Sequence, residues 1–155
     1  MLQAISIGFV AFLSSVAIFD GNKGRYREKD TPNPSYYYGW TKLLGEQSVA
    51  MIPNHTIVRT DFFNPSGFKY NTVFTDHFCS KIPIDELALI LRGLVKSEYR
   101  GIINIGRERD TLFNILKQYI PDINGITIAE SNMPDFPRDL SLDLNLLRTL
   151  FPVSQ

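Results

Sequence analysis

The chain has 155 residues, 44% of them apolar and 21% charged, which is the composition of an ordinary soluble globular protein with room for a hydrophobic core. Sixteen basic residues balance sixteen acidic ones, so the charge gives no reason to expect a nucleic acid or an anionic membrane as a partner. The single cysteine, Cys79, excludes an internal disulfide and fits a reducing compartment, so we expect a cytoplasmic protein. With two isolated histidines, His55 and His77, and no cysteine pair, the sequence indicates no metal site.

Residues 1–19 carry no charged side chain, so they could form a buried strand or a membrane anchor. No basic residue precedes Lys23, and Gln3 and three serines interrupt the apolar run, unlike a signal peptide or a spanning helix. The stretch is short, β-branched and followed by the turn residues Asp20 and Gly21. This pattern predicts a parallel strand over residues 7–14, apolar on both faces. A membrane anchor stays as the alternative.

A helix is predicted between two turn-rich segments. Residues 21–35 are polar and rich in Gly, Pro and Asn, which is typical of a loop. Side chains then recur with helical spacing before Pro53, which predicts a helix over residues 36–52. These side chains are Tyr36, Trp40, Leu43, Leu44, Gln47 and Met51.

The remainder of the chain alternates short apolar runs with amphipathic segments. The pattern predicts strands at 55–60, 101–106 and 125–130, a helix over 84–95, a helix over 110–119, and an amphipathic turn or two over 140–150. Alternation of strands and helices indicates an α/β protein with a largely parallel sheet.

Tyr38 and Lys42 are separated by four positions in the predicted helix, so both side chains can reach one site. A phenol is a poor acid–base catalyst near neutral pH, and a neighbouring ammonium favours its ionised form. The pair is therefore a candidate for proton transfer. An ordinary surface tyrosine is the alternative interpretation of so short a motif.

Ser14 and Ser15 follow the predicted first strand directly. The carboxyl ends of strands are where open α/β sheets bind ligands, and the next helix would bring Tyr38 to the same edge. A serine there could donate a hydrogen bond to a substrate carbonyl while Tyr38 donates its proton. With hydride delivered to the carbonyl carbon, this arrangement would reduce a ketone.

The segment from Ser14 to Gln47 carries several short motifs in a fixed order. They are Ser15 with Phe19, Asp20 and Gly21, then Asp30, Pro32 and Pro34, then Tyr38, Gly39, Thr41, Lys42, Gly45 and Glu46. This order resembles that of extended short-chain dehydrogenases of the dTDP-4-dehydrorhamnose reductase type. The similarity continues through "IVRTDFF", "FTDHFCSKIPIDELALIL", "GIINIG" and "FPRDLSLDLNLL", and so covers nearly the whole chain.

The resemblance implies a set of roles. Tyr38 would be the proton donor, Lys42 would orient the cofactor ribose, and Ser15 would bind the carbonyl. Tyr38 and Lys42 would contact NADP or NAD, and the substrate would be a nucleotide sugar of deoxysugar biosynthesis. The substrate side would include Ser14, Phe62 and Asn64, although plain core packing beside Phe63 explains Phe62 equally well. Arg59 is expected to be structural.

The resemblance also implies a division of the chain. Residues 1–60 would be the carboxyl-terminal part of a Rossmann-type parallel sheet with the Tyr-x-x-x-Lys helix, and residues 61–155 a small substrate-binding α/β lobe, together forming one compact unit. Two departures from the family stand out. The segment after the Arg-Thr strand is shorter, and Phe136 occupies a position where the family often has arginine, which weakens any expectation of nucleotide binding there.

The sequence also lacks a glycine-rich dinucleotide motif. Its ten glycines include no three with G-x-G-x-x-G or G-x-x-G-x-x-G spacing, which the cofactor pyrophosphate requires. By the resemblance, the chain begins near the fifth strand of a Rossmann sheet. Three interpretations follow: a fragment or half of a split reductase, a catalytically silent sugar-nucleotide-binding or regulatory module, or an unrelated membrane-anchored domain. A complementing amino-terminal half or a homo-oligomer is expected as partner.

Overall fold

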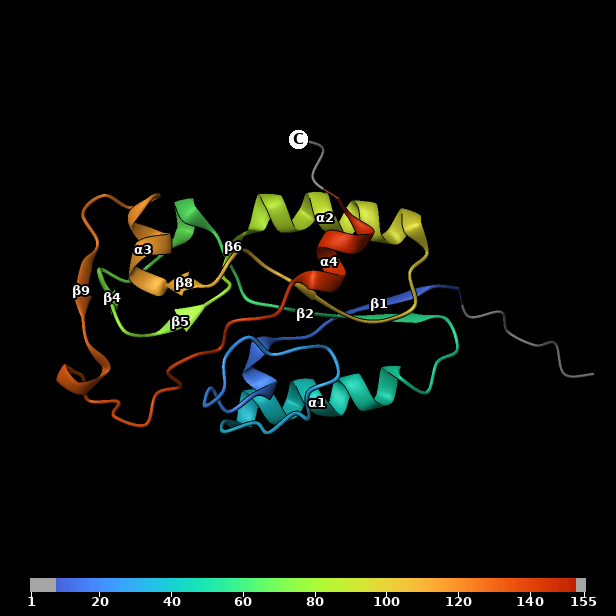
Figure 1. The fold of residues 1–155 in the computed structure, drawn as a ribbon, viewed down its shortest axis with the longest axis horizontal. Helices are drawn as coiled ribbons and strands as arrows, with labels where there is room; N and C mark the ends of the chain where they lie inside the picture. Colours follow the sequence, from blue (N-terminus) through green and yellow to red (C-terminus); the bar gives the residue numbers. More distant parts are fainter. Residues whose placement is uncertain (1–7, 153–155) are drawn as a thin grey trace, which may run out of the picture.

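The computed structural model describes residues 8–152 (Figure 1). Its main sheet has three parallel strands in the order β1-β2-β7: β1 (Val10–Leu13), β2 (His55–Thr60) and β7 (Gly101–Ile105). The two central side chains of β2, Ile57 and Val58, are both buried, as expected for a strand covered on both faces. The predicted α/β class and the parallel strand after residue 7 are confirmed, while residue 7 lies outside the described residues.

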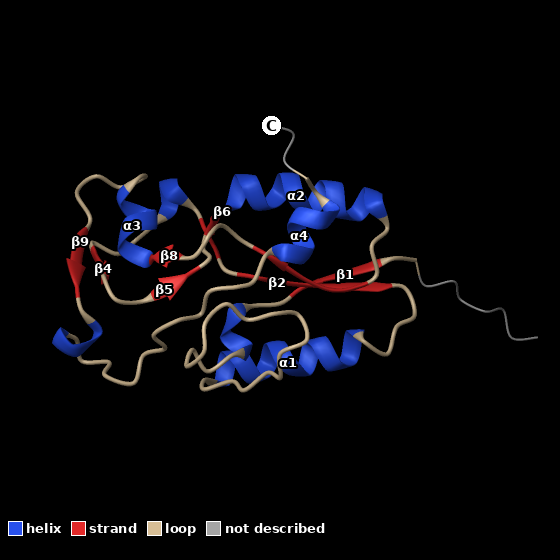
Figure 2. Ribbon diagram, viewed as in Figure 1, coloured by secondary structure: helices blue, strands red, loops and turns tan. Residues whose placement is uncertain are grey.

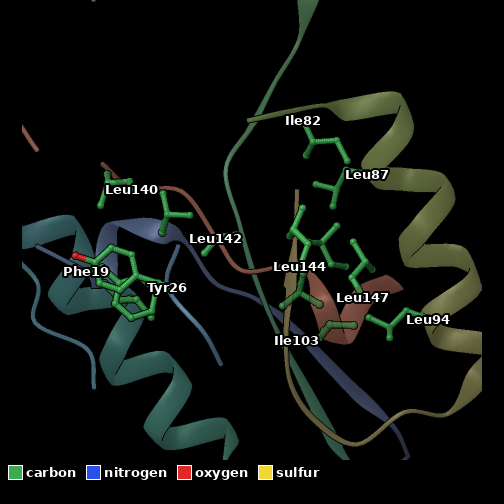
Figure 3. Packing of buried hydrophobic residues seen from close by; sticks show 14 residues of the cluster. Phe19, Tyr26, Ile82, Leu87, Leu94, Ile103, Leu140, Leu142, Leu144 and Leu147 are labelled. Carbon is green, nitrogen blue, oxygen red and sulfur yellow. The ribbon is translucent and has the colours of Figure 1, made fainter. Parts of the chain in front are cut away.

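Helices cover both faces of this sheet (Figures 1 and 2). Helix α1 (Tyr37–Val49) lies on one face, and α2 (Ile84–Ser97) with α4 (Asn145–Leu150) lies on the other. The main hydrophobic core spans the sheet and joins Ile103 of β7 to Leu87 and Leu94 of α2 (Figure 3). The predicted helices over 36–52 and 84–95 are confirmed with small shifts at their ends.

Helix α1 buries a different side from the one that its apolar spacing suggests. The buried positions are Gly39 and Glu46, with Leu43 packed against the main core. Trp40 and Leu44 are exposed. Gly39 is buried because it faces the preceding 3-10 turn closely, and Glu46 is buried because it pairs with an arginine of the sheet.

A smaller lobe follows β2 and has its own core. Its elements are β3 (Phe62–Phe63), β4 (Thr72–Phe74), β5 (Phe78–Cys79), β6 (Ile82–Pro83), β8 (Asp110–Thr111), α3 (Leu112–Lys117) and β9 (Asn124–Ile126). They form two-stranded pairs: β3 with β6 and β4 with β9 are parallel, and β5 with β8 is antiparallel. The core of this lobe contains Phe63, Val73, Cys79, Ile115, Leu116 and Ile123.

Two predicted elements of this lobe differ from the structure. The strand predicted over 125–130 ends at Ile126, because the Thr127 hydroxyl and the Glu130 carboxylate cap a short 3-10 helix over 128–130. The helix predicted over 110–119 is shorter, since residues 110–111 pair with β5 before the Thr111 hydroxyl caps α3.

The division at residue 60 stays a prediction, and the main sheet takes its third strand, β7, from beyond that point. Residues 137–144 connect the two parts, because their backbone pairs with the loop after β1. Tyr26 N donates to Ser141 O at 2.9 Å, and Asp143 N donates to Tyr26 O at 2.8 Å.

Within residues 8–152, no helix is long and apolar enough to span a bilayer.

Candidate functional site

The candidate site lies where β1 ends. Ser15 follows the strand and begins a 3-10 turn over Val16–Ile18, in which its Oγ accepts a hydrogen bond from Ala17 N at 3.2 Å. A hydroxyl that accepts in this way keeps its own proton for another acceptor. Ser15 is therefore held in place by the turn and is able to donate to a carbonyl oxygen.

Helix α1 brings Tyr38 and Lys42 to the same place. Lys42 Nζ donates to the carbonyl of Leu13, the last residue of β1, at 2.9 Å and lies 5.8 Å from the centroid of the Tyr38 ring. The Tyr38 side chain is 55% exposed, so a ligand can reach it. Lys42 thus lies between the carboxyl end of β1, where Ser15 follows, and the ring of Tyr38.

A glycine makes this approach possible. An added Cβ on Gly39 would lie 2.0 Å from the carbonyl oxygen of Ala17, inside the turn that Ser15 begins. No side chain fits at that distance, so the first turn of α1 contacts the 3-10 turn through backbone alone. Since Gly39 follows Tyr38 directly, this contact sets how closely the helix backbone beside Tyr38 approaches the turn that Ser15 begins.

Ser14 has a different environment from Ser15. It is buried, and its Oγ donates to Oε1 of Glu46 at 2.6 Å. Glu46 also accepts two hydrogen bonds from Arg59 of β2, at 3.0 Å from Nε and 2.7 Å from Nη2. This buried group joins β1, α1 and β2 directly behind the site. The predicted contact of Ser14 with substrate stays a prediction.

Glu46 and Arg59 belong to separate sequence motifs, and the sequence does not indicate that they pair. The expectation that Arg59 is structural agrees with its burial and its bidentate contact with Glu46. The signal that could have found the pair is the presence of two ionisable residues in segments predicted to be buried.

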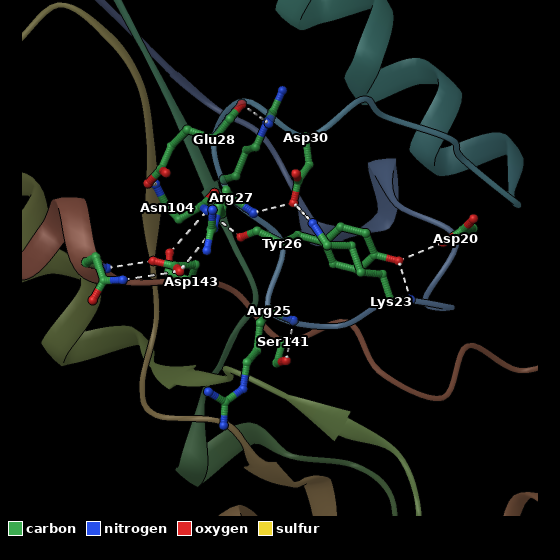
Figure 4. Close-up of polar contacts among 12 residues, drawn as sticks. Asp20, Lys23, Arg25, Tyr26, Arg27, Glu28, Asp30, Asn104, Ser141 and Asp143 are labelled. Carbon is green, nitrogen blue, oxygen red and sulfur yellow. Dashed lines mark hydrogen bonds and ion pairs between the residues drawn. The ribbon is translucent and has the colours of Figure 1, made fainter.

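The loop between Ser15 and α1 is fastened by polar contacts rather than free (Figure 4). The hydroxyl of Tyr26 donates to Asp20 at 2.6 Å, and this contact is the largest of the causes that hold the pKa of Asp20 below its usual range. Burial raises the pKa of Tyr26, whose ring stacks on Phe19 with centroids 4.1 Å apart. Asn104 of β7 donates to the carbonyl of Tyr26 at 2.8 Å. The loop is thus attached to the sheet.

Phe62 and Asn64 lie beyond β2. Phe62 is partly exposed in β3, opposite Ile82, and Asn64 Oδ1 accepts from Ser66 N at 3.1 Å in a 3-10 turn. Neither residue lines the cavity of about 570 Å³ that opens among β4, β9 and α3 in the small lobe. Their role in substrate binding stays a prediction.

The site residues fit one end of a dinucleotide. An ammonium has three donors, and one of those of Lys42 is used by Leu13, so two can serve ribose hydroxyls beside the exposed Tyr38 ring. The printed sequence contains no glycine-rich turn that could bind the pyrophosphate of the dinucleotide. Within residues 8–152, no group of three His, Cys, Asp or Glu side chains could hold a metal ion.

Comparison with known proteins finds similarity in both sequence and fold. A profile of the RmlD substrate binding domain matches residues 4–77. A hypothetical dTDP-4-dehydrorhamnose reductase from Sulfolobus tokodaii superposes with a TM-score of 0.78 and 29% identity, over 94% of this chain and 59% of that chain. The NADP complex of the Bacillus anthracis reductase superposes with a TM-score of 0.78 over 95% of this chain and 61% of that chain, and at 19% identity shows the fold alone.

The fold of the described residues is similar to that of dTDP-4-dehydrorhamnose reductases. In sequence, the chain resembles the RmlD substrate binding domain over residues 4–77 and a dTDP-4-dehydrorhamnose reductase over most of its length. It spans about three fifths of the length of the reductases just described.

A second group of relatives matches a shorter stretch. The β subunit of methionine adenosyltransferase 2 from Bos taurus is 50% identical over 48 residues, which are 30% of this chain and 14% of that protein. The Xenopus tropicalis subunit is 46% identical over a stretch of the same length.

Proposed function

We propose that the chain supplies the substrate side of an NAD(P)-dependent reductase that reduces the ketone of a nucleotide sugar, of the dTDP-4-dehydrorhamnose type, in deoxysugar biosynthesis in the cytoplasm. The observation that carries this proposal is the contact of Lys42 with both the last residue of β1, which Ser15 follows closely, and the ring of Tyr38. Similarity to the RmlD substrate binding domain and to a dTDP-4-dehydrorhamnose reductase supports the same chemistry.

Each side chain has a defined task in this reaction. Ser15 donates a hydrogen bond to the ketone oxygen, because the turn occupies its acceptor side and leaves its proton available. Tyr38 donates the proton that the oxygen receives, and Lys42 offsets the negative charge that this leaves on the phenol. NADPH or NADH, when bound, would supply the hydride and leave as NADP or NAD. Lys42 is held by Leu13 at the correct end of the strand for this role.

The printed sequence has no glycine-rich turn for the cofactor pyrophosphate, so the proposal assigns that group to a partner. Strand β1 offers a place for that partner to join. In the described region it pairs on one side with β2, and the segment contains no charged residue to block a further strand. In the Rossmann order 3-2-1-4-5-6, the strand before β1 would occupy this edge. A complementing amino-terminal half, or a second copy, is therefore the proposed partner.

The test is to co-express the chain with the dinucleotide-binding half of the Sulfolobus tokodaii reductase. NADPH oxidation is then measured with dTDP-4-dehydrorhamnose. The pair should turn over, and Tyr38→Phe should lower the rate by roughly 10²- to 10⁴-fold, the usual contribution of a positioned acid. Tyr37→Phe is the matched control, since that neighbouring side chain is 85% exposed. Equal rates for the two variants would contradict the role of Tyr38. The chain alone should show no turnover with NADH or NADPH.

A second function is favoured by the match to the β subunits of methionine adenosyltransferase 2. Those proteins are named as subunits, so the chain could instead be a catalytically silent binding or regulatory module. The same co-expression experiment separates the two. A complex that binds NADPH and the nucleotide sugar tightly but turns over neither, in wild type and Tyr38→Phe alike, would favour the silent module.

A further inference from the structure

A small polar cavity lies at the β7 end of the sheet, two strands away from β1 in the order β1-β2-β7. The loop that follows β1 reaches this end, because Glu28 accepts from the backbone N–H of Asn104 in β7 at 3.1 Å. The cavity has a volume of about 150 Å³, and its charged lining residues are Arg25, Glu108, Arg109, Asp143 and Arg148. None of its lining residues belongs to the candidate site or to the larger cavity of the small lobe. Sites for drug-sized ligands have volumes of roughly 300–1,000 Å³, so this cavity suits a smaller group.

The arginines in and beside this cavity outnumber the carboxylates that pair with them. Three arginines are paired: Arg27 with Asp143 at 3.5 Å, Arg109 with Asp139 at 2.8 Å, and Arg148 with Glu108. The guanidinium of the fourth, Arg25, forms no ion pair or hydrogen bond with any residue of the described range 8–152. Its side chain is exposed and extends away from the loop, and no dashed line reaches its guanidinium in Figure 4. The cavity therefore has one cation without a counter-charge.

The backbone of Arg25 is strained. Its φ of 46° lies in the left-handed region, which an arginine rarely adopts. Two contacts hold it there, because Arg25 N donates to the hydroxyl of buried Ser141 at 2.9 Å, and that hydroxyl donates to Asp139 at 2.6 Å. Strain of this kind is typical of functional sites. Here it fixes the direction in which the Arg25 side chain leaves the backbone.

Arg109 supplies further donors to the same cavity. Its guanidinium lies 3.6 Å from the centroid of the Phe78 ring, and its Nε donates to Asp139, which leaves the two terminal nitrogens without a hydrogen bond to the described residues. A guanidinium is a planar fork of N–H donors that matches the oxygens of a phosphate group. Since Arg25 and Arg109 both line this cavity, one tetrahedral anion can accept charge-assisted hydrogen bonds from both.

We propose that this cavity binds the phosphoryl group of a small anion, with Arg25 as its principal ligand and Arg109 as the second. Inorganic phosphate and the phosphate end of a small monoester share this chemistry. The site goes beyond the proposed reductase function, because it uses none of the residues assigned to that reaction and is filled without cofactor or ketone. The bound anion joins the loop after β1 to the segment after β7.

The test is equilibrium dialysis of the full chain with radiolabelled inorganic phosphate at constant ionic strength, which measures the bound anion whatever the oligomeric state. Binding should saturate at one phosphate per chain, and chloride should not displace it. Displacement by glycerol phosphate would support the site and identify a monoester as a source of the group, whereas displacement by unlabelled phosphate alone would support a site for the inorganic ion. Binding that does not saturate, or that chloride removes, would show general attraction of anions to the surface and overturn the proposal. Absence of binding would overturn it too.

Variants at Arg25 give a second measurement. Arg25→Gln should weaken phosphate binding by roughly 10- to 150-fold, the range for losing a hydrogen bond to a charged group. If that variant does not fold, Arg25→Gly removes the guanidinium with a residue that adopts a φ of 46° without strain. Arg92→Gln in α2 is the matched control, because Arg92 is also exposed and lies outside the cavity, and it should leave the affinity nearly unchanged. Glu108→Gln should tighten binding, since it removes a carboxylate from the lining and frees Arg148. Equal affinities in the folded Arg25 and Arg92 variants would refute the site.

Discussion

The buried ion pair behind the site gives the sharpest test of the structure. Glu46 and Arg59 are 4% and 3% exposed, and Glu46 also accepts the hydroxyl of Ser14. Substituting Glu46→Ala removes the carboxylate from both partners. It leaves the Arg59 guanidinium without a counter-ion in a region closed to water, and the Ser14 hydroxyl without an acceptor.

The expected cost is large because the remaining charge cannot be solvated. Breaking a buried pair by removing one partner destabilises by about 3–5 kcal/mol. A domain of this size has a free energy of unfolding of about 5–15 kcal/mol, so a large fraction of it would be lost. At about 2–4 °C per kcal/mol, the melting temperature should fall by roughly 6–20 °C.

Urea unfolding followed by far-ultraviolet circular dichroism measures the effect. The matched control is Glu86→Ala in α2, which breaks the pair with Arg107, where both side chains are about a third or more exposed. That loss should be only about 0–1 kcal/mol. The double variant Glu46→Leu with Arg59→Met should recover most of the stability, since no buried charge remains. If Glu46→Ala cost no more than the Glu86 control, Arg59 would have to be solvated, and the burial described above would be wrong.

Three further outcomes are expected. Gly39→Ala should destabilise the chain, because its Cβ would overlap the carbonyl of Ala17. In the complemented reductase the same variant should lower turnover. Gly8→Ala, which has open space around it, is the control for the melting temperature and the rate. Burial lowers the pKa of His77 in the folded chain below its ordinary value of 6.5. As the pH falls below about 6.5, the unfolded chain takes up this proton before the folded chain does, so the free energy of unfolding should decrease. In His77→Gln, the midpoint of urea unfolding should depend less on pH below about 6.5. An unchanged pH dependence would exclude His77 as its cause. The uncharged edge of β1 should make the isolated chain self-associate or precipitate; a monodisperse monomer in sedimentation at micromolar concentration would show that the edge is covered.

The sheet and the helices on its faces could be predicted from sequence because their signals are local. The strand over 55–60 agrees with the structure residue for residue, and its short apolar run is bounded by Pro53 and Asn54 on one side. Helix α2 shows a clear amphipathic repeat from Ile84, and its buried leucines face the core as that repeat requires. In these segments, local propensity and the pattern of burial both favour the observed element.

The small lobe was harder to predict because its strands are only two or three residues long. A strand of that length has no period to detect, and its pairing depends on partners far away in the chain. Pairing of β4 with β9 joins residues about fifty positions apart, and a capping hydroxyl at Thr127 ends β9 where apolar spacing alone would continue it. The cavity of this lobe, which lies between such elements, has no signature in the sequence for the same reason.

The candidate site falls between these two cases. The relation of Tyr38 to Lys42 follows from helix geometry, and the position of Ser15 at a strand end follows from the apolar run before it. What could not be predicted is the distance between the strand and the helix. That distance is set by Gly39 against Ala17 and by the carboxylate of Glu46, which holds α1 to β1 and β2 at once. The helix that presents the proposed acid is thus positioned by a buried charge two turns along the same helix. Stability and catalytic alignment depend on the same carboxylate, so variants that weaken the Glu46 pair should disturb both together.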